Sequence, residues 1–166
     1  MDNKVKILSN NVRGLQSFMK RRKIFHHLNS SPNADIIMLQ ETHSSKETEN
    51  QWRAEWGGTI HFSHGTNEAR GVCILIKDRV DFELKEIIRD KEGRYLQIKG
   101  MLNGKSLSLS NVYGPNKNDI QFFVDILEKI DRAETSSAGI LIVFGTMKWT
   151  KKEDYQDMLT RRTKNS

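Results

Sequence analysis

The chain has 166 residues and a formal net charge of +6, with 36% hydrophobic and 29% charged residues. This length and composition predict one polar globular domain, and the single cysteine excludes a disulfide framework within the chain, which favours a reducing, intracellular environment. No run approaches the ~18 consecutive apolar residues of a membrane span, and no apolar signal segment follows Met1, so we expect no membrane partner. The positive charge favours an anionic partner such as nucleic acid, although a merely soluble basic domain fits it equally well.

The first third of the chain alternates between strand and helix patterns. "VKILS" (5–9) reads as a strand that ends in a polar turn, and a helix is expected from about residue 17 to 28, with Phe18, Phe25 and Leu28 on its apolar face. The basic run 20–23 is expected to be its solvated face. "DIIMLQ" (35–40) is nearly continuous in apolar residues, which is typical of a central strand covered on both faces.

After "ETHSS", a helical stretch with Trp52 and Trp56 is expected to end at Gly57-Gly58, and a series of strands follows. The histidines at 61 and 64, like those at 26 and 27, are interpreted as surface residues, and Cys73 as a buried small side chain. "NG" at 103–104 separates two strand patterns and predicts a hairpin.

The last elements are a helix and a strand. Asn118 or Asp119 is expected to cap a helix whose apolar residues recur at i, i+3, i+4 and i+7. "ILIVF" (140–144) reads as a buried strand after which Gly145 turns the backbone. We therefore expect a mixed α/β (α+β) domain over residues 1–147, followed by a basic, weakly ordered tail at 148–166.

Three strand ends deliver polar residues, and each of them is ambiguous alone. Glu41 at the exit of a buried strand could hold a hard cation such as Mg²⁺, or it could cap the following turn in solvent. Asn11 could offer a neutral oxygen ligand or simply stabilise its turn. Tyr113 could hold a phosphate oxygen through its hydroxyl, or it could be core packing.

In their order and spacing these residues resemble a known family. The stretches "ILSNNVRGLQS", "IIMLQETHSS", "RGVCILIKD", "RDKEGRYLQIKG" and "LSNVYGPN" are similar to the endonuclease/exonuclease/phosphatase superfamily (exonuclease III/apurinic-endonuclease-like), Mg²⁺-dependent phosphodiesterases. Within it, "RDKEGRYLQIKG" favours the N-terminal endonuclease domain of LINE-type retrotransposons. The resemblance runs from about residue 4 to 145 and implies a DNase I-like four-layer αββα sandwich with largely antiparallel, mixed sheets, here incomplete.

The resemblance also implies roles for individual residues. Glu41 would be the main Mg²⁺ ligand, Asn11 would support the metal or its water, and Tyr113 and Asn116 would contact the scissile phosphate of DNA. His43, beside Glu41, would lie near the substrate.

The basic residues of the first helix complete the expected nucleic-acid contacts. These are Lys20, Arg21 and Arg22. The family implies a DNA substrate, no small organic cofactor, a monomer and, as a further expectation, a nuclear location.

The chain departs from the family after its last strand. Where the family has Gly-Asp-Phe-Asn, this sequence has Gly145-Thr146-Met147-Lys148, so the Asp that activates water is a threonine and the Asn is a lysine. The late Ser-Asp-His of the family has no counterpart, and Arg13 stands where some branches carry an acid or asparagine. Because general acid–base groups contribute typically ~10²–10⁴-fold and act as a unit, we expect a truncated, catalytically impaired enzyme.

Three alternatives remain open at this point. The chain could be a non-catalytic nucleic-acid-binding remnant that uses its basic helix and tail. It could be a relative that hydrolyses small phosphoesters, although "RDKEGRYLQIKG" argues against this. It could also be a partly folded translation product without function.

Overall fold

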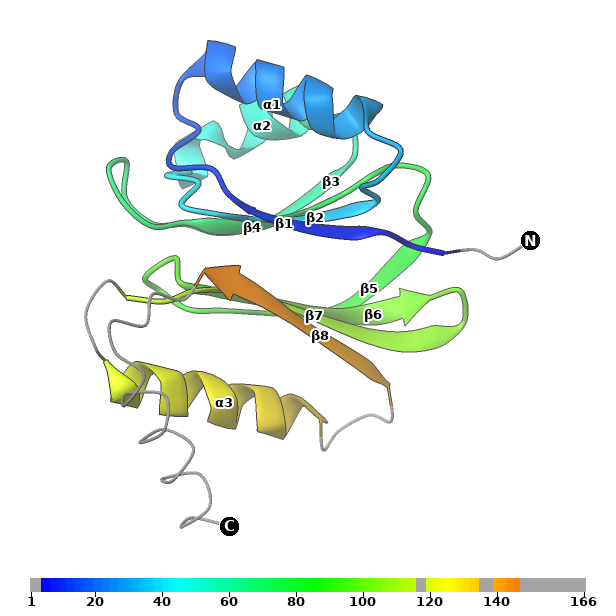
Figure 1. Cartoon of the computed structure of the whole chain (residues 1–166), viewed down its shortest axis with the longest axis vertical. Coiled ribbons are helices and arrows are strands. Elements are labelled where there is room, and N and C mark those ends of the chain that lie inside the picture. The colour runs from blue at the N-terminus through cyan, green and yellow to red at the C-terminus, as the bar shows by residue number, and fades with distance from the viewer. Residues whose placement is uncertain (1–3, 116–118, 135–138, 147–166) are drawn as a thin grey trace.

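Two four-stranded sheets pack face to face and carry helices on their outer surfaces (Figure 1). The computed structural model describes residues 4–115, 119–134 and 139–146. Helices α1 and α2 cover one outer face and α3 the other, which gives the four layers α/β/β/α (Figure 1). The expected α+β sandwich with mixed sheets is therefore confirmed.

The first sheet has the strand order β1-β2-β4-β3. The strands are β1 (Ile7–Asn11), β2 (Ile36–Gln40), β3 (Thr59–Ser63) and β4 (Val72–Ile76). The pair β1–β2 is parallel, and β2–β4 and β3–β4 are antiparallel. All residues of the central strands β2 and β4 are buried, as the apolar run 35–40 predicts.

The helices over this sheet are α1 (Phe18–Ser30) and α2 (Glu49–Trp56), the latter preceded by a short 3₁₀ helix, η1 (Lys46–Thr48). Phe25 packs edge-on against both Trp52 and Trp56, which places the aromatic core of this half between helices and sheet. The α2 helix ends at Gly57, whose φ of +77° is the left-handed cap that glycine adopts most readily.

The second sheet has the order β5-β6-β7-β8 and is antiparallel except for its last pair. Its strands are β5 (Phe82–Arg89), β6 (Tyr95–Leu102), β7 (Lys105–Tyr113) and β8 (Ile140–Thr146), and α3 (Ile120–Glu134) covers it. The predicted hairpin joins β6 to β7 through Asn103 and Gly104, both at positive φ. Asp119 caps α3, because its carboxylate accepts the Phe122 amide at 3.0 Å.

Some local expectations were wrong. The strand at 140–144 is not fully buried and does not turn at Gly145; β8 is an edge strand that continues to Thr146. Glycine is needed at 145 because a Cβ there would overlap the carbonyl oxygen of Val112 on β7. Phe18 is 44% exposed, so it does not belong to the apolar face of α1.

Two supposed surface residues lie inside. Arg21 is 2% exposed and forms a two-pronged ion pair with Glu55 of α2, at 2.6 and 2.7 Å, beneath the Trp52 ring. His61 on β3 is 9% exposed, and burial, aided by the charges of Arg53 and Arg89, lowers its pKa to about 4. Cys73 is buried as expected, and burial raises the pKa of its thiol.

Within the described ranges, no helix is long and apolar enough to cross a bilayer. The predicted tail at 148–166 lies outside those ranges, as do Met147 and residues 116–118.

Candidate phosphodiester site at the strand ends

Four strand ends meet at one end of the sandwich. In the first sheet, the parallel register pairs Asn11 at the end of β1 with Gln40 at the end of β2. In the second, it pairs Tyr113 at the end of β7 with Thr146 at the end of β8. The carboxyl ends of neighbouring parallel strands lie on one edge, and side-chain bonds between the two edges bring them together.

A chain of polar contacts crosses from one sheet to the other. The Asn11 side-chain amide donates to Oε1 of Glu41 at 2.8 Å and approaches the Thr146 hydroxyl at 3.4 Å. Thr146 in turn donates to the side-chain oxygen of Gln40 at 3.1 Å. Asn11, Glu41 and Thr146, far apart in the sequence, therefore lie side by side.

A buried amide pair braces this end of the sandwich from within. Gln40 donates to Oδ1 of Asn111 on β7 at 2.7 Å, and Asn111 donates to the carbonyl oxygens of Leu39 and Cys73 at 3.0 and 2.8 Å. Both amides are buried, so every one of these bonds is shielded from water. This pair was not predicted from the sequence; the available signal was an amide at the end of the apolar strand β2 and another within β7.

The turn that carries Glu41 is clamped by backbone hydrogen bonds on two sides. The Glu41 carbonyl accepts from Gly14 at 2.6 Å, while Thr42 and His43 donate to Gly71 and Arg70 at 3.0 and 2.9 Å. Glu41 and His43 have φ values of +53° and +54°, which cost about 1–3 kcal/mol each for residues with a side chain. Such conformations persist only where the surroundings impose them, so the backbone from which the half-buried Glu41 side chain extends is held in place.

A divalent cation such as Mg²⁺ needs oxygen ligands, and this end of the sandwich offers a small set of them. Among the described residues, no cluster of three or more His, Cys, Asp or Glu side chains could form an all-protein cage. Glu41 is one carboxylate, and the Asn11 amide presents its N–H to Glu41 while its oxygen accepts from the Arg13 backbone at 3.1 Å. This set fits Mg²⁺, which protein sites commonly hold by one or two carboxylates together with waters and substrate phosphate.

Tyr113 is 6% exposed and packs in the core between the sheets. Its ring lies under the guanidinium of Arg94, at 5.4 Å, and its backbone amide donates to the Arg94 carbonyl at 2.8 Å. Positions 11, 41 and 113 thus surround one end of the sandwich, with the Tyr113 ring largely covered.

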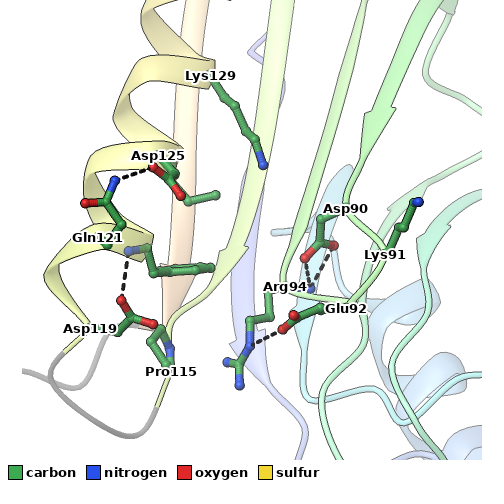
Figure 2. A pocket seen from close by; sticks show the side chains of 11 residues that line it. Asp90, Lys91, Glu92, Arg94, Pro115, Asp119, Gln121, Asp125 and Lys129 are labelled. Atoms are coloured by element: carbon green, nitrogen blue, oxygen red, sulfur yellow. Dashed lines mark hydrogen bonds and ion pairs between the residues drawn. The ribbon is translucent and has the colours of Figure 1, made fainter.

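A pocket of about 480 Å³ lies beside this end, between the β5–β6 turn and the start of α3 (Figure 2). Its acidic and basic groups largely satisfy one another or the backbone. Asp90 accepts the amides of Arg94 and Tyr95, and Gln121 donates to Asp125 at 2.7 Å. The pocket is therefore a mixed-charge surface and not a basic groove for phosphates.

The remaining predicted contacts are placed as follows. Lys20 is exposed, but its ammonium donates to the carbonyls of Val12, Arg13 and Gly14 and so closes the β1–α1 turn.

Arg22 is exposed and available to a partner, whereas Arg21 is buried in its ion pair and is removed from the set of nucleic-acid contacts. His43 is half-buried beside Glu41, and Asn116 lies outside the described residues. His26 and His27 are exposed as expected.

Comparisons with known proteins agree with this fold. The chain is 30% identical over 117 residues to the Xenopus laevis "Transposon TX1 uncharacterized 149 kDa protein". The aligned segment makes up 69% of this chain and 9% of that protein. Among solved structures it is similar to D. rerio TDP2 complexed with single strand DNA product, with a TM-score of 0.67, 22% identity and coverage of 95% of this chain and 65% of that one. It is also similar to an AP endonuclease from Archaeoglobus fulgidus, with a TM-score of 0.57, 20% identity and coverage of 86% and 56%.

The family model supplies the decisive match. The model of the Endonuclease/Exonuclease/phosphatase family matches residues 9–145. This range includes Asn11, Gln40 and Tyr113 at three of the four strand ends and stops one residue before Thr146 at the fourth. The chain therefore belongs to the endonuclease/exonuclease/phosphatase family, as a nuclease- or phosphodiesterase-like domain with a transposon-encoded homologue.

Proposed function

We propose that this chain is a retrotransposon-type endonuclease domain with a Mg²⁺ site at Glu41, DNA as its substrate class, and impaired turnover. The observation that carries the proposal is the contact of 2.8 Å between Asn11 and Glu41 at the shared strand ends. The transposon homologue and the DNA-bound structural relative favour a nucleic-acid substrate.

In this proposal Glu41 supplies the anionic ligand, and Asn11 orients it through the bond to Oε1. A divalent ion bound there would neutralise charge on a phosphoryl group and polarise it. The clamped backbone of the Glu41 turn fixes the carboxylate before substrate binds, which limits the reorganisation needed on binding.

Impairment follows from the residue at the end of β8. The Thr146 hydroxyl donates to Gln40, and an alcohol cannot serve as a carboxylate base for the attacking water. Loss of such a group typically reduces rate by ~10²–10⁴-fold.

Two measurements on the same samples test the proposal. In a plasmid-nicking assay with Mg²⁺, the chain should cleave no faster than a matched Glu41→Gln variant. In a thermal melt, Mg²⁺ should raise the midpoint of the original chain and not that of Glu41→Gln, because only an ion bound to the folded state shifts the equilibrium. Robust Mg²⁺-dependent nicking that Glu41→Gln abolishes would disprove impairment but keep the site, whereas equal melting shifts in both proteins would disprove the site.

A second candidate function, nucleic-acid binding without cleavage, is favoured by the outer face of α1. Arg22, Lys23 and His26 are exposed there, beside the exposed side chain of Met19. Binding through phosphates must weaken with salt, so retention on duplex DNA should fall steeply between about 50 and 200 mM salt.

The double change Arg22→Ala/Lys23→Ala should flatten that salt slope by about 1–2 units, while Lys105→Ala at the β6–β7 hairpin should leave it unchanged. Salt-insensitive retention would reject this candidate.

The main proposal also includes a monomeric, nuclear protein without a small organic cofactor. Gel filtration tests the monomeric state, and imaging of the tagged chain tests the nuclear location.

A further inference from the structure

Behind the Glu41 turn, four side chains form one continuous line of hydrogen bonds. Glu49 at the start of α2 contacts Nε2 of His64 at 2.7 Å, and Nδ1 of His64 contacts the Ser44 hydroxyl at 2.9 Å. Ser44 contacts the hydroxyl of Thr42 at 3.1 Å. Thr42 directly follows Glu41, so the line ends beside the proposed ligand.

Simple chemistry gives this line a direction. An ionised carboxylate only accepts hydrogen bonds, so Nε2 of His64 must carry the proton that faces Glu49. When the ring is neutral, Nδ1 is an acceptor and the Ser44 hydroxyl donates to it. Ser44 is left to accept from Thr42, so both buried hydroxyls are oriented toward the histidine.

The surroundings of His64 hold the ring in this role. Its ring stacks on Phe62, with centroids 5.0 Å apart and planes inclined by 26°. Burial raises the pKa of Glu49, but the hydrogen bonds from His64 and Arg53 outweigh this and keep the pKa below its ordinary value. Glu49 is therefore an anion at neutral pH, as the direction of the line requires.

Serine, histidine and a carboxylate also form the nucleophilic triads of hydrolases, but this line cannot act as one. Ser44 is 1% exposed and Thr42 is completely buried, so no substrate reaches either hydroxyl. The buried end of the line meets backbone that is already tied to its neighbours: Thr42 donates to Gly71 and accepts from Leu15, both at 3.0 Å. A Cβ at Gly71 would overlap the Thr42 hydroxyl, so the glycine leaves the space that this side chain occupies.

We propose that His64 is a positioning residue: through Ser44 and Thr42 it fixes the left-handed turn that aims Glu41. The inference rests on the proposed role of Glu41 as a cation ligand, but the positioning itself is a property of the metal-free protein. Two experiments separate these claims.

The first experiment needs no metal and uses NMR. Nitrogen-15 shifts of the His64 ring should show a proton on Nε2 and an acceptor at Nδ1. Ser44→Ala should displace the backbone amide resonances of Glu41 and Thr42, while His26→Gln, an exposed control on α1, should leave them in place. A proton on Nδ1 at neutral pH, or unchanged Glu41 and Thr42 resonances in a folded Ser44→Ala protein, would overturn the proposal.

The second experiment compares two replacements of His64 by titration with Mg²⁺ in a calorimeter. Gln can donate to Glu49 and accept from Ser44, whereas Phe keeps the stacking on Phe62 and loses both hydrogen bonds. We expect His64→Phe to weaken Mg²⁺ binding by about 10-fold or more, in line with lost supporting contacts at metal sites, and His64→Gln to restore most of it. If the His64→Phe variant binds Mg²⁺ as tightly as the original chain, the ring acts only by packing and the proposal fails. If the original chain binds no Mg²⁺, the proposed function fails, and the NMR measurements alone decide the positioning role.

Discussion

The two strand ends that meet across the candidate site differ in how firmly the fold holds them. β2 is a central strand whose residues are all buried, and it leads into Glu41, whose turn is hydrogen-bonded on two sides. β8 is an edge strand in which Ile140 and Val143 are 54% and 38% exposed, and it ends in the neutral Thr146. The Glu41 carboxylate thus lies on the firmly held side, while the neutral Thr146, where the resemblance leads us to expect an acid, lies on the weakly covered side.

The two halves of the proposed site are therefore expected to be physically separable. In the proposed site, Glu41 would supply the cation ligand from one sheet, and the end of β8 would supply the water-activating position from the other. Among the described residues, Asn11 and Gln40 link the two positions by hydrogen bonds. We therefore expect a substitution at the end of β8 to alter proton handling in the proposed site without disrupting the turn that holds Glu41. Four predictions probe this contrast.

The largest effect is expected in the layer that covers the first sheet. Arg21→Ala should lower the free energy of unfolding by about 3–5 kcal/mol, because it leaves Glu55, whose side chain is 12% exposed, without its partner. Urea denaturation measures this change. Arg22→Ala, one residue along on the exposed face, should stay within about 0.5 kcal/mol. Similar losses in both variants would mean that this layer is not held by the buried ion pair.

The next prediction concerns pH and the buried His61. Its pKa is lowered from 6.5 in an unfolded chain to about 4 in the folded protein. Below pH 6.5 the unfolded state binds more protons, so stability should fall as pH decreases toward about 4 and then level off. At about 1.36 kcal/mol per pKa unit, the loss is on the order of 3 kcal/mol.

Melts of the original chain and His61→Leu between pH 7 and pH 4 isolate this contribution. The difference in stability between the two proteins should change as pH falls, because only the original chain loses the contribution of His61. His27→Gln, on the exposed side of α1, should show the same pH dependence as the original chain. Parallel curves for the original chain and His61→Leu would show that His61 is not held neutral.

The third prediction restores an acid at the weakly held side. Thr146→Asp places a second carboxylate beside Asn11 and Gln40, so Mg²⁺ affinity measured by calorimetry should rise about tenfold, or about 1.4 kcal/mol. Without the ion, repulsion from Glu41 should lower the melting midpoint, and Mg²⁺ should more than recover it. Thr146→Asn provides the isosteric control. Equal affinities for the Asp and Asn variants would indicate that the end of β8 does not face the cation site.

The smallest effect is expected at the β6–β7 hairpin, which contributes to neither of the two strand ends. Gly104 has a φ of +74°, and a Cβ added there would meet no atom within 4 Å, so Gly104→Ala costs only the left-handed backbone conformation, about 1 kcal/mol. Thermal unfolding measures it, and Mg²⁺ binding should not change. A loss of Mg²⁺ affinity in this variant would show that the hairpin and the site are coupled.

The local elements could be read from the sequence where short-range patterns dominate. The hairpin at Asn103-Gly104, the cap at Asp119 and the helix end at Gly57 each depend on a few adjacent residues, and the structure confirms all three. The buried strand β2 was equally accessible, because a short, nearly continuous apolar run is typical of a strand covered on both faces. Arg21 was misread because its neighbours are charged, and only the approach of α2 brings Glu55 to it.

The sequence by itself determined the order of elements and the carboxylate at the exit of β2, since both depend on periodicity and on residues adjacent along the chain. Only the tertiary structure decided which residues share the site: Asn11, Glu41 and Thr146 meet because the sheets stack, a relation over as many as 135 positions. It also decided that His64 lies behind the Glu41 turn, that Gln40 and Asn111 bridge the sheets, and that β8 forms an edge. Burial and partner choice are properties of packed surfaces, and no short-range pattern in the chain encodes them.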